Sequence, residues 1–228
     1  MPIVEFSSIW KTYRMGDTDV HALRDISVSF EEGEYVAIMG ASGSGKSTML
    51  NLLGCLDQPT SGRYFLGGED VSRLTDDRLS EMRGARIGFI FQSYNLIAQL
   101  TVLENIEIPL YYQGATERAS RERATALAEK VGLTPRLRHR PTELSGGQQQ
   151  RVAIARALAS DPLIRLGDEP TGNLDSVTGR EVLDILDGLA DSGKTIFIVT
   201  HDESVAQHAH RIFHLADGRV VKERRGGR

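Results

Sequence analysis

The sequence is poor in features that would tie it to an oxidising compartment or to a membrane. Cys55 is the only cysteine among the 228 residues, so no internal disulfide can form and no cysteine cluster is available for zinc. No run approaches about 18 consecutive apolar residues, so we expect no segment to span a membrane. Met1–Glu5 lacks a basic start followed by an apolar run, so we expect no signal peptide. If a membrane is involved, another chain must supply it.

The sequence also lacks a basic excess. Its formal net charge is −4, with 27 Lys and Arg against 31 Asp and Glu, so we expect no nucleic-acid partner. The basic segment Lys222–Arg228 is an exception, and we expect it to be a frayed, solvated end. The length and a hydrophobic fraction of 40% are ordinary for one globular domain, with or without a subdomain, that folds without disulfides.

Short strand-like segments alternate with longer helical patterns through most of the chain. This alternation predicts an α/β fold built from βαβ units around a mainly parallel sheet. The segments rich in strand-forming residues are Ile3–Trp10, Ile26–Phe30, Tyr35–Met39, Ile87–Phe91, Thr195–Thr200 and Arg211–Leu215.

The middle of the chain, residues 93–160, differs because strand signals vanish and helix signals dominate. Thr101 and Glu104 have the spacing of a capping box before an apolar helical run. Arg118–Val131 and Gln149–Ser160 are predicted as further helices. We therefore predict a single domain over residues 1–228, in which residues 1–92 and 161–228 form an α/β core and residues 93–160 form a helical insertion.

A phosphate-binding loop is predicted directly after the apolar run Tyr35–Met39. A strand, the pattern G-x-x-x-x-G-K-[ST] and a helix are the arrangement that a P-loop requires, since glycines let backbone N–H groups converge on an anion at a helix N-terminus. Lys46 would reach the β- and γ-phosphates, and Ser47 would bind Mg²⁺. A flexible glycine-serine turn is the alternative, but the flanking strand and helix favour the P-loop. The loop reads Gly40-Ala41-Ser42-Gly43-Ser44-Gly45-Lys46-Ser47, and the helical pattern continues from Thr48.

Two acidic residues, Asp168 and Glu169, end a second apolar run that begins at Leu163. A carboxylate at a strand end near a P-loop can hold Mg²⁺ and the next one can orient the attacking water, so we assign Asp168 to the metal and Glu169 to the water. Taken alone, the pair is better explained as a surface turn before Pro170, and only the other motifs favour catalysis. Arg165 is unusual in this run, because a charge in a covered strand is costly. It would either reach out to solvent or mark a sheet edge.

His201 follows the apolar run Ile196–Thr200 and is therefore also expected at a strand end. A lone histidine is more often structural. Beside the predicted P-loop and acidic pair, however, His201 is a candidate to contact the γ-phosphate.

The segment Leu144-Ser145-Gly146-Gly147-Gln148 indicates a second anion site. Ser145 can cap the helix that follows, while Gly146 and Gly147 expose backbone N–H groups at its positive end. A plain capping box between Ser145 and Gln148 is the alternative, and the two interpretations are compatible. Together with the P-loop and Asp168, this segment resembles the signature of ABC ATPases, and the resemblance covers essentially the whole chain.

The resemblance implies an α/β fold of the P-loop NTPase type: a RecA-like core with an N-terminal antiparallel β-subdomain and an inserted helical subdomain. It also implies ATP and Mg²⁺ as cofactors, adenine stacking on Tyr13, a glutamine (Gln92) that senses Mg²⁺ and water, and a D-loop ending at Asp175. The nucleotide-binding residues are then expected to be Tyr13, Gly40, Ala41, Ser42, Gly43, Ser44, Gly45, Lys46, Ser47, Thr48, Ser145, Gly146, Gly147, Gln148 and Asp175. The metal-binding residues are expected to be Ser47, Gln92 and Asp168, and the catalytic residues Glu169, His201 and Gln92.

The resemblance further implies a homodimer in the ATP-bound state, with ATP between the P-loop of one copy and the signature of the other. This dimer is expected to drive an integral membrane permease from the cytoplasmic face of the cell membrane. The macrolide-export and lipoprotein-release type is most similar, on the segments Leu53–Asp57, Ile87–Gln92, Leu103–Ile106 and Pro170–Ser176. A nutrient-importer ATPase and a cell-division ATPase stay open. A soluble ATPase acting on DNA is disfavoured, because no long coiled coil separates Lys46 from Ser145, and one acting on ribosomes is disfavoured, because the chain carries only one set of motifs.

Two departures from the family pattern are mild. Ala41 stands where proline is common and Arg165 where an aliphatic residue is common, and neither removes a group that the chemistry needs. The apolar stretch Tyr94–Tyr112 is expected to supply mostly core, with some side chains lining a groove for a cytoplasmic coupling helix of the permease.

Overall fold

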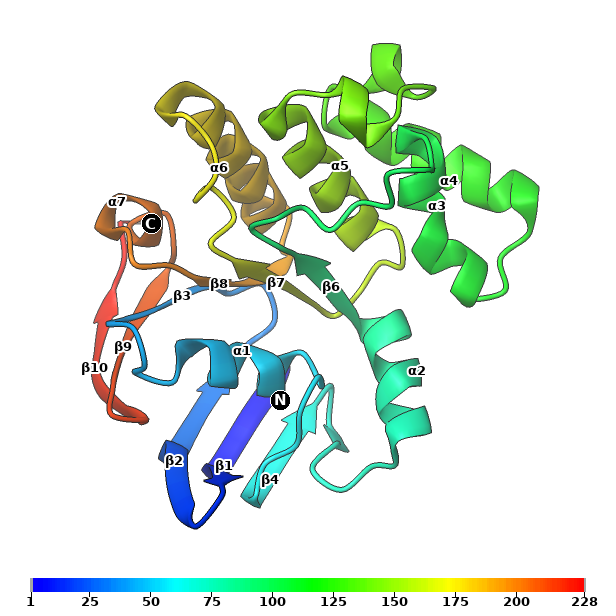
Figure 1. Ribbon diagram of the computed structural model, residues 1–228. Coiled ribbons are helices and arrows are strands. Elements are labelled where there is room, and N and C mark those ends of the chain that lie inside the picture. The colour runs from blue at the N-terminus through cyan, green and yellow to red at the C-terminus, as the bar shows by residue number, and fades with distance from the viewer. Residues whose placement is uncertain (1, 228) are drawn as a thin grey trace.

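The computed structural model of the chain describes residues 2–227, so the predicted domain limits at residues 1 and 228 lie outside the described part. Two sheets form the framework (Figure 1). The smaller sheet is antiparallel, with the strand order β2-β1-β4-β5, and the larger one is mainly parallel, with the order β10-β9-β3-β8-β7-β6. These sheets confirm the predicted α/β core with an antiparallel N-terminal sheet.

The smaller sheet contains β1 (Val4–Met15), β2 (Thr18–Phe30), β4 (Ser61–Leu66) and β5 (Glu69–Asp70). The predicted segments Ile3–Trp10 and Ile26–Phe30 lie in β1 and β2, but both strands are longer because their polar ends pair across a hairpin. The tight turn between them contains Gly16 at a φ of 63°, which glycine adopts without strain.

The larger sheet contains β3 (Tyr35–Gly40), β6 (Ile87–Ile90), β7 (Ile164–Asp168), β8 (Thr195–Val199), β9 (Arg211–Ala216) and β10 (Arg219–Arg225). All neighbours are parallel except β9 and β10. The strand β8 is buried along its whole length, as expected for a parallel strand that is covered on both faces.

The helices are α1 (Lys46–Leu53), α2 (Asp76–Arg86), α3 (Val102–Tyr112), α4 (Glu117–Lys130), α5 (Gly146–Leu158), α6 (Ser176–Asp191) and α7 (Glu203–Ala206). Two 3₁₀ turns, η1 (Thr134–Arg136) and η2 (Pro141–Glu143), precede α5. The capping box of Thr101 and Glu104 is confirmed at the start of α3. The helix predicted from Gln149 begins earlier, at Gly146, because Ser145 caps it.

Side chains alternate between two cores on either face of the larger sheet. In β3, Tyr35 and Ala37 face the core shared with α5 and α6, whereas Val36 and Ile38 face the core shared with α1 and the smaller sheet. Figure 1 shows the same layers, with α5 and α6 on one side of the sheet and α1 with β1 and β2 on the other. Helices α3 and α4 pack on α5, which also packs on β6. The division of the chain at residues 93 and 160 stays a prediction.

The C-terminal segment differs from the sequence expectation. The sequence predicts a frayed end over Lys222–Arg228, but Lys222–Arg225 belongs to β10, which pairs with β9. Gly226 and Gly227 continue this attachment by donating backbone hydrogen bonds to His210 and Gln207. Main-chain pairing of this kind does not depend on apolar side chains, so the basic sequence gave no sign of it. Residue 228 lies outside the described part.

Arg165 is only 2% exposed and lies in β7, between β8 and β6, so the edge and solvent-reaching interpretations are both wrong. Its Nη2 lies 3.4 Å from Asp161 Oδ1, which also accepts a hydrogen bond from Lys194 at 3.0 Å. The buried Nε of Arg165 has no partner among the described residues. Burial lowers the pKa of Arg165, and Asp161 only partly opposes this effect.

No helix within residues 2–227 combines the length and apolar character that crossing a bilayer requires.

We predict that Arg165→Met leaves the protein as stable or stabilises it by about 1–2 kcal/mol, because replacing a buried ion with a well-packed apolar side chain removes its desolvation cost. Thermal and urea unfolding measure the effect. As a control, Asp161→Asn should destabilise, since it leaves the buried guanidinium without its anion. A loss of more than about 2 kcal/mol in Arg165→Met would contradict this account of the site.

Candidate functional site

The loops that follow β3, β6, β7 and β8 lie next to one another, because these parallel strands are neighbours and all end at the same edge of the sheet. They carry the predicted P-loop, Gln92, the acidic pair and His201, respectively. In parallel α/β sheets this edge is where ligands bind. The topology therefore brings together groups that are far apart in sequence.

The P-loop connects β3 to α1 as predicted, and it wraps around the amine of Lys46. The Nζ of Lys46 donates hydrogen bonds to the carbonyl oxygens of Gly40 at 2.7 Å and Ala41 at 2.9 Å. Gly45 has a φ of 105°, and a Cβ there would lie 2.6 Å from the Ala22 carbonyl oxygen of β2. A larger residue at position 45 would therefore be strained and would clash with the smaller sheet.

The N-terminus of α1 is open. No side chain caps it, and no hydrogen bond within residues 2–227 satisfies the N–H groups of Lys46, Ser47 and Thr48. Free N–H groups and the positive end of the helix dipole attract an anion, and Lys46 adds a full positive charge. This arrangement can bind a phosphate group.

Asp168 ends β7, and Glu169 follows it in a left-handed conformation with a φ of 45°. Burial, and then the charge of Glu169, raises the pKa of Asp168, while Lys46 opposes the shift. Two like charges beside a cation can attract a divalent ion or polarise a water.

Three donors surround the carboxylate of Glu169. Thr200 Oγ1 donates to Oε2 at 3.1 Å, the backbone N–H of His201 donates to Oε1 at 3.1 Å, and His201 Nδ1 lies 2.6 Å from the same oxygen. The hydrogen bond and the charge of Glu169 raise the pKa of His201. The side chain of Glu169 is 17% exposed and that of His201 is 77% exposed, so the histidine presents its ring to solvent.

Gln92 reaches the same region from the loop after β6. Its Nε2 donates to Asn173 Oδ1 at 3.2 Å, and Asn173 Nδ2 donates to the Gln92 carbonyl oxygen at 3.0 Å. Asn173 lies four residues after Glu169, so the predicted glutamine is joined to the segment that carries the acidic pair.

Tyr13 lies beside α1 and is held by charged neighbours. Its hydroxyl donates to Asp57 Oδ2 at 2.7 Å and also interacts with Thr48. Lys11 Nζ lies 4.9 Å from the centre of the ring and donates to Asp57 Oδ1 at 2.5 Å. Burial, followed by the contact with Asp57, raises the pKa of Tyr13. The ring is thus fixed next to the P-loop helix.

The signature segment occupies the start of α5, with both halves of the Ser145 and Gln148 capping box present. A Cβ on Gly147 would lie 2.0 Å from Thr178 Cγ2 of α6, so only glycine fits this contact. Within residues 2–227, no hydrogen bond or ion pair joins this segment to the P-loop. Asp175 likewise acts as the N-cap of α6, accepting from the N–H groups of Val177 and Thr178.

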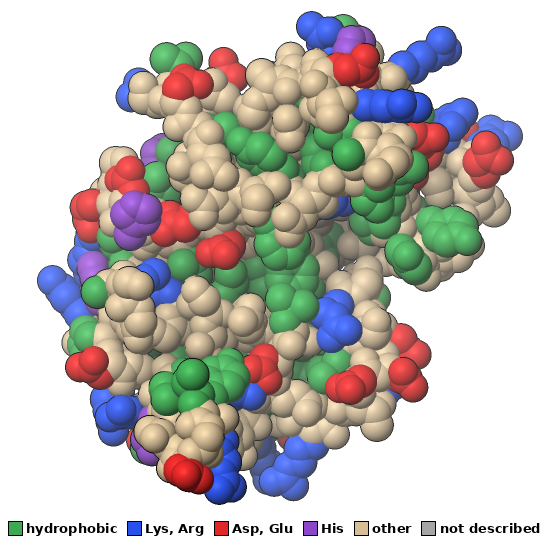
Figure 2. Space-filling model, in the orientation of Figure 1, with side chains coloured by type: hydrophobic (Ala, Val, Ile, Leu, Met, Phe, Trp, Pro, Cys, Tyr) green, Lys and Arg blue, Asp and Glu red, His purple; other side chains and the backbone are tan. Residues whose placement is uncertain are grey.

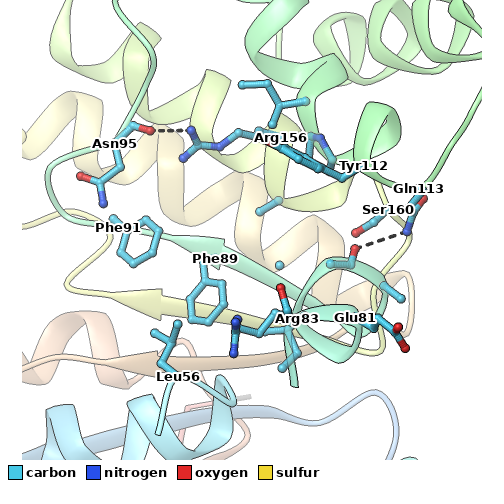
Figure 3. A pocket seen from close by; sticks show the side chains of 18 of the residues that line it. Leu56, Glu81, Arg83, Phe89, Phe91, Asn95, Tyr112, Gln113, Arg156 and Ser160 are labelled. Carbon is cyan, nitrogen blue, oxygen red and sulfur yellow. Dashed lines mark hydrogen bonds between the residues drawn. The ribbon is translucent and has the colours of Figure 1, made fainter. Parts of the chain in front are cut away.

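A cleft of about 1090 Å³ opens between α2, β6 and the ends of α3 and α5. Phe89 and Phe91 line it and stack with their ring centres 5.4 Å apart. Figure 3 shows these rings with Leu56, Tyr112 and Arg156 around the cleft, and Figure 2 shows hydrophobic side chains in the hollow between the helices at the top and the elements below. Of the apolar stretch Tyr94–Tyr112, Ile108 and Tyr112 line the cleft, whereas Val102, Ile106 and Leu110 belong to the core.

Several residues of the site gave no local signal in the sequence. Lys11 and Asp57 are 46 positions apart and meet only when β1 lies beside the segment between α1 and β4. Thr200 and Asn173 lie inside recognised motifs, but their bonds to Glu169 and Gln92 depend on strand order. Long-range contacts of this kind can be found only once the topology is known.

Comparison with known proteins supports one family. Residues 23–172 match the family described as ABC transporter. An ABC transporter ATP-binding protein of Thermotoga maritima is 52% identical, over 98% of this chain and 96% of its own length. The macrolide export ATP-binding/permease protein MacB of Hyphomonas neptunium is 49% identical over 97% of this chain, which spans only 34% of that longer protein.

A solved structure agrees with these matches. The ATP-binding cassette MJ0796, in a dimeric post-hydrolysis state bound to ADP and Pi, is 46% identical with a TM-score of 0.89, over 97% of this chain and 98% of its own. Its likeness confirms the P-loop NTPase fold that the sequence predicted. The chain therefore belongs to the ABC transporter family, as one of its ATP-binding and ATP-hydrolysing cassettes.

Proposed function

We propose that two copies of this chain enclose ATP between the P-loop of one copy and the signature segment of the other. The observation that carries this proposal is the separation of two anion-binding helix ends within one chain, since no hydrogen bond or ion pair within residues 2–227 joins the open end of α1 to the glycine-rich start of α5. A second copy would let both ends face one triphosphate. The dimeric MJ0796 cassette with bound ADP and Pi supports the arrangement.

In this proposal each group of the site has one task. The N–H groups of α1 and Lys46 bind the phosphates, and Tyr13 stacks on adenine. Glu169 orients the attacking water, and His201 contacts the γ-phosphate. Because Glu169 is already bonded to Thr200 and His201, contact between the histidine and a phosphate would also move or polarise the carboxylate.

The donor set fits Mg²⁺ only in the presence of nucleotide. No group of three or more His, Cys, Asp or Glu residues within residues 2–227 could hold a metal alone. Ser47 and Asp168, with Gln92 nearby, would supply a hydroxyl, a carboxylate and an amide oxygen, and Mg²⁺ usually completes its shell with phosphates and waters. When bound, the ion compensates the charge of the phosphates.

We expect Glu169→Gln to bind ATP but to lose turnover by about 10²–10⁴-fold, because the amide cannot accept a proton from water. Without turnover, ATP should stay in the interface and a dimer should accumulate. Size-exclusion chromatography with and without ATP, together with a phosphate-release assay, measures both effects. Adding Lys46→Ala should abolish dimerisation. A Glu169→Gln variant that remains monomeric in saturating ATP would contradict the proposal.

We further propose that the dimer drives a membrane permease in an export process, from the cytoplasmic face of the membrane. The match to MacB, which is named as both ATP-binding and permease protein, supports a permease partner. The cleft lined by Phe89 and Phe91 suits an amphipathic helix of that partner, because its floor is apolar and its α2 rim carries Asp77 and Glu81.

Tyr112 provides a test of this docking. It lines the cleft and is 80% exposed, whereas its neighbour Tyr111 is 78% exposed and lies outside the cleft. The tagged Glu169→Gln chain would be expressed in the native host and purified from membranes solubilised with ATP present. We expect a multi-pass membrane protein to co-purify with it, and adding Tyr112→Asp to the tagged chain to abolish this recovery. Tyr111→Asp should have little effect. Equal loss with both variants, or with neither, would contradict docking in the cleft.

A further inference from the structure

Gln92 is attached to the segment that follows the acidic pair by two reciprocal hydrogen bonds. Its carboxamide nitrogen donates to Asn173 Oδ1 at 3.2 Å, and Asn173 Nδ2 returns a bond to the backbone carbonyl of Gln92 at 3.0 Å. An asparagine can do this because one side chain carries both a donor and an acceptor. The pairing uses only the Nε2 of Gln92, which leaves its Oε1 available for another partner.

The backbone beside Asn173 is shaped around the same carboxamide. A Cβ on Gly172 would lie 2.7 Å from Gln92 Nε2 and 3.3 Å from its Cδ, closer than side chains normally approach. The backbone of Gly172 therefore packs directly on the amide of Gln92. This contact is independent of the hydrogen bonds.

Short turns fix Asn173 relative to Glu169. The N–H of Gly172 donates to the Glu169 carbonyl oxygen at 3.0 Å, and the N–H of Leu174 donates to that of Thr171 at 3.1 Å. From α5, the fully buried Gln150 donates to the Pro170 carbonyl oxygen at 2.7 Å. Asn173 thus has little freedom to move without Glu169.

The turn that follows Gln92 lies at the cleft and is strained. Tyr94 and Asn95, just after Gln92, both have positive φ values, 60° and 48°, although neither is glycine. Arg156 clamps this turn by donating to the carbonyl oxygens of Tyr94 at 2.8 Å and Asn95 at 2.5 Å. Asn95 and Arg156 both line the cleft, as Figure 3 shows.

We propose that Asn173 is the positioning residue of Gln92, and that its two hydrogen bonds hold the Gln92 carboxamide in place beside the segment that carries Glu169. Asn173 itself acts only through Gln92. The inference rests on the proposed role of Gln92.

The first test is the Mg²⁺ dependence of ATP hydrolysis by the purified chain at fixed ATP. Loss of an outer-shell partner typically weakens a metal site about 10–100-fold, so Asn173→Ala should raise the half-saturating Mg²⁺ concentration about tenfold or more. Gln92→Ala shows the full shift that loss of the Gln92 amide causes. The double variant Gln92→Ala with Asn173→Ala should raise the half-saturating Mg²⁺ concentration little further. Binding of a fluorescent ATP analogue without Mg²⁺ should stay unchanged in Asn173→Ala, which shows that the variant is folded.

The outcomes separate this inference from the proposed function. If Gln92→Ala shifts the Mg²⁺ dependence but Asn173→Ala does not, the positioning role of Asn173 is wrong and the role of Gln92 stands. If Gln92→Ala itself has no effect, the proposed role of Gln92 fails and the inference fails with it.

Hydrogen exchange supplies a second readout that does not require turnover. The Asn173→Ala variant lacks both hydrogen bonds to Gln92. The backbone amide protons of residues 92–96 should therefore exchange faster, while those of β6 and β7 exchange as in the parent protein. Exchange that is identical to the parent protein in residues 92–96 would overturn the proposed link, whatever the ATPase rate.

Discussion

The alignment of β3, β8, β7 and β6 at one edge of the larger sheet is the constraint on which the site depends. Each strand end delivers one group: Lys46 through the P-loop, His201, the acidic pair, and Gln92. A slip of one residue in any register would move its group by about 3.3 Å and turn it to the other face. The two cores prevent such a slip, because the alternating side chains of β3 and β8 are buried on both faces.

This rigid framework also holds backbone conformations that would be unfavourable elsewhere. Glu169, Tyr94 and Asn95 all have positive φ values without being glycine, at a cost of about 1–3 kcal/mol each. All three lie in loops at the same edge, and each is held by hydrogen bonds from other elements: Thr200 and His201 for Glu169, and Arg156 for the turn. Five other non-glycine residues with positive φ lie elsewhere in the described part of the chain, so such conformations are not confined to this edge.

The sequence predicted the parts of this structure that local chemistry determines. The P-loop, the capping boxes of Thr101 and Ser145, and the apolar strands β3 and β8 follow from glycine conformation, side-chain capping and burial on two faces. Strand β10 was missed because its pairing uses the main chain of a polar segment, and Arg165 was misplaced because its counter-ion Asp161 lies in a loop. The contacts of Lys11 with Asp57 and of Gln92 with Asn173 could not be predicted, since strand order alone brings them together.

The central claim is that ATP joins the P-loop of one copy to the signature segment of another. Engineered cysteines test it most directly, because Cys55 is the only native cysteine and is buried. Differently tagged Glu169→Gln chains, one carrying Ser42→Cys and the other Ser145→Cys, would be mixed and treated with a short bis-thiol cross-linker. The account predicts a mixed cross-linked dimer that forms with ATP and not without it. No mixed dimer in saturating ATP, or only pairs of like chains, would contradict it.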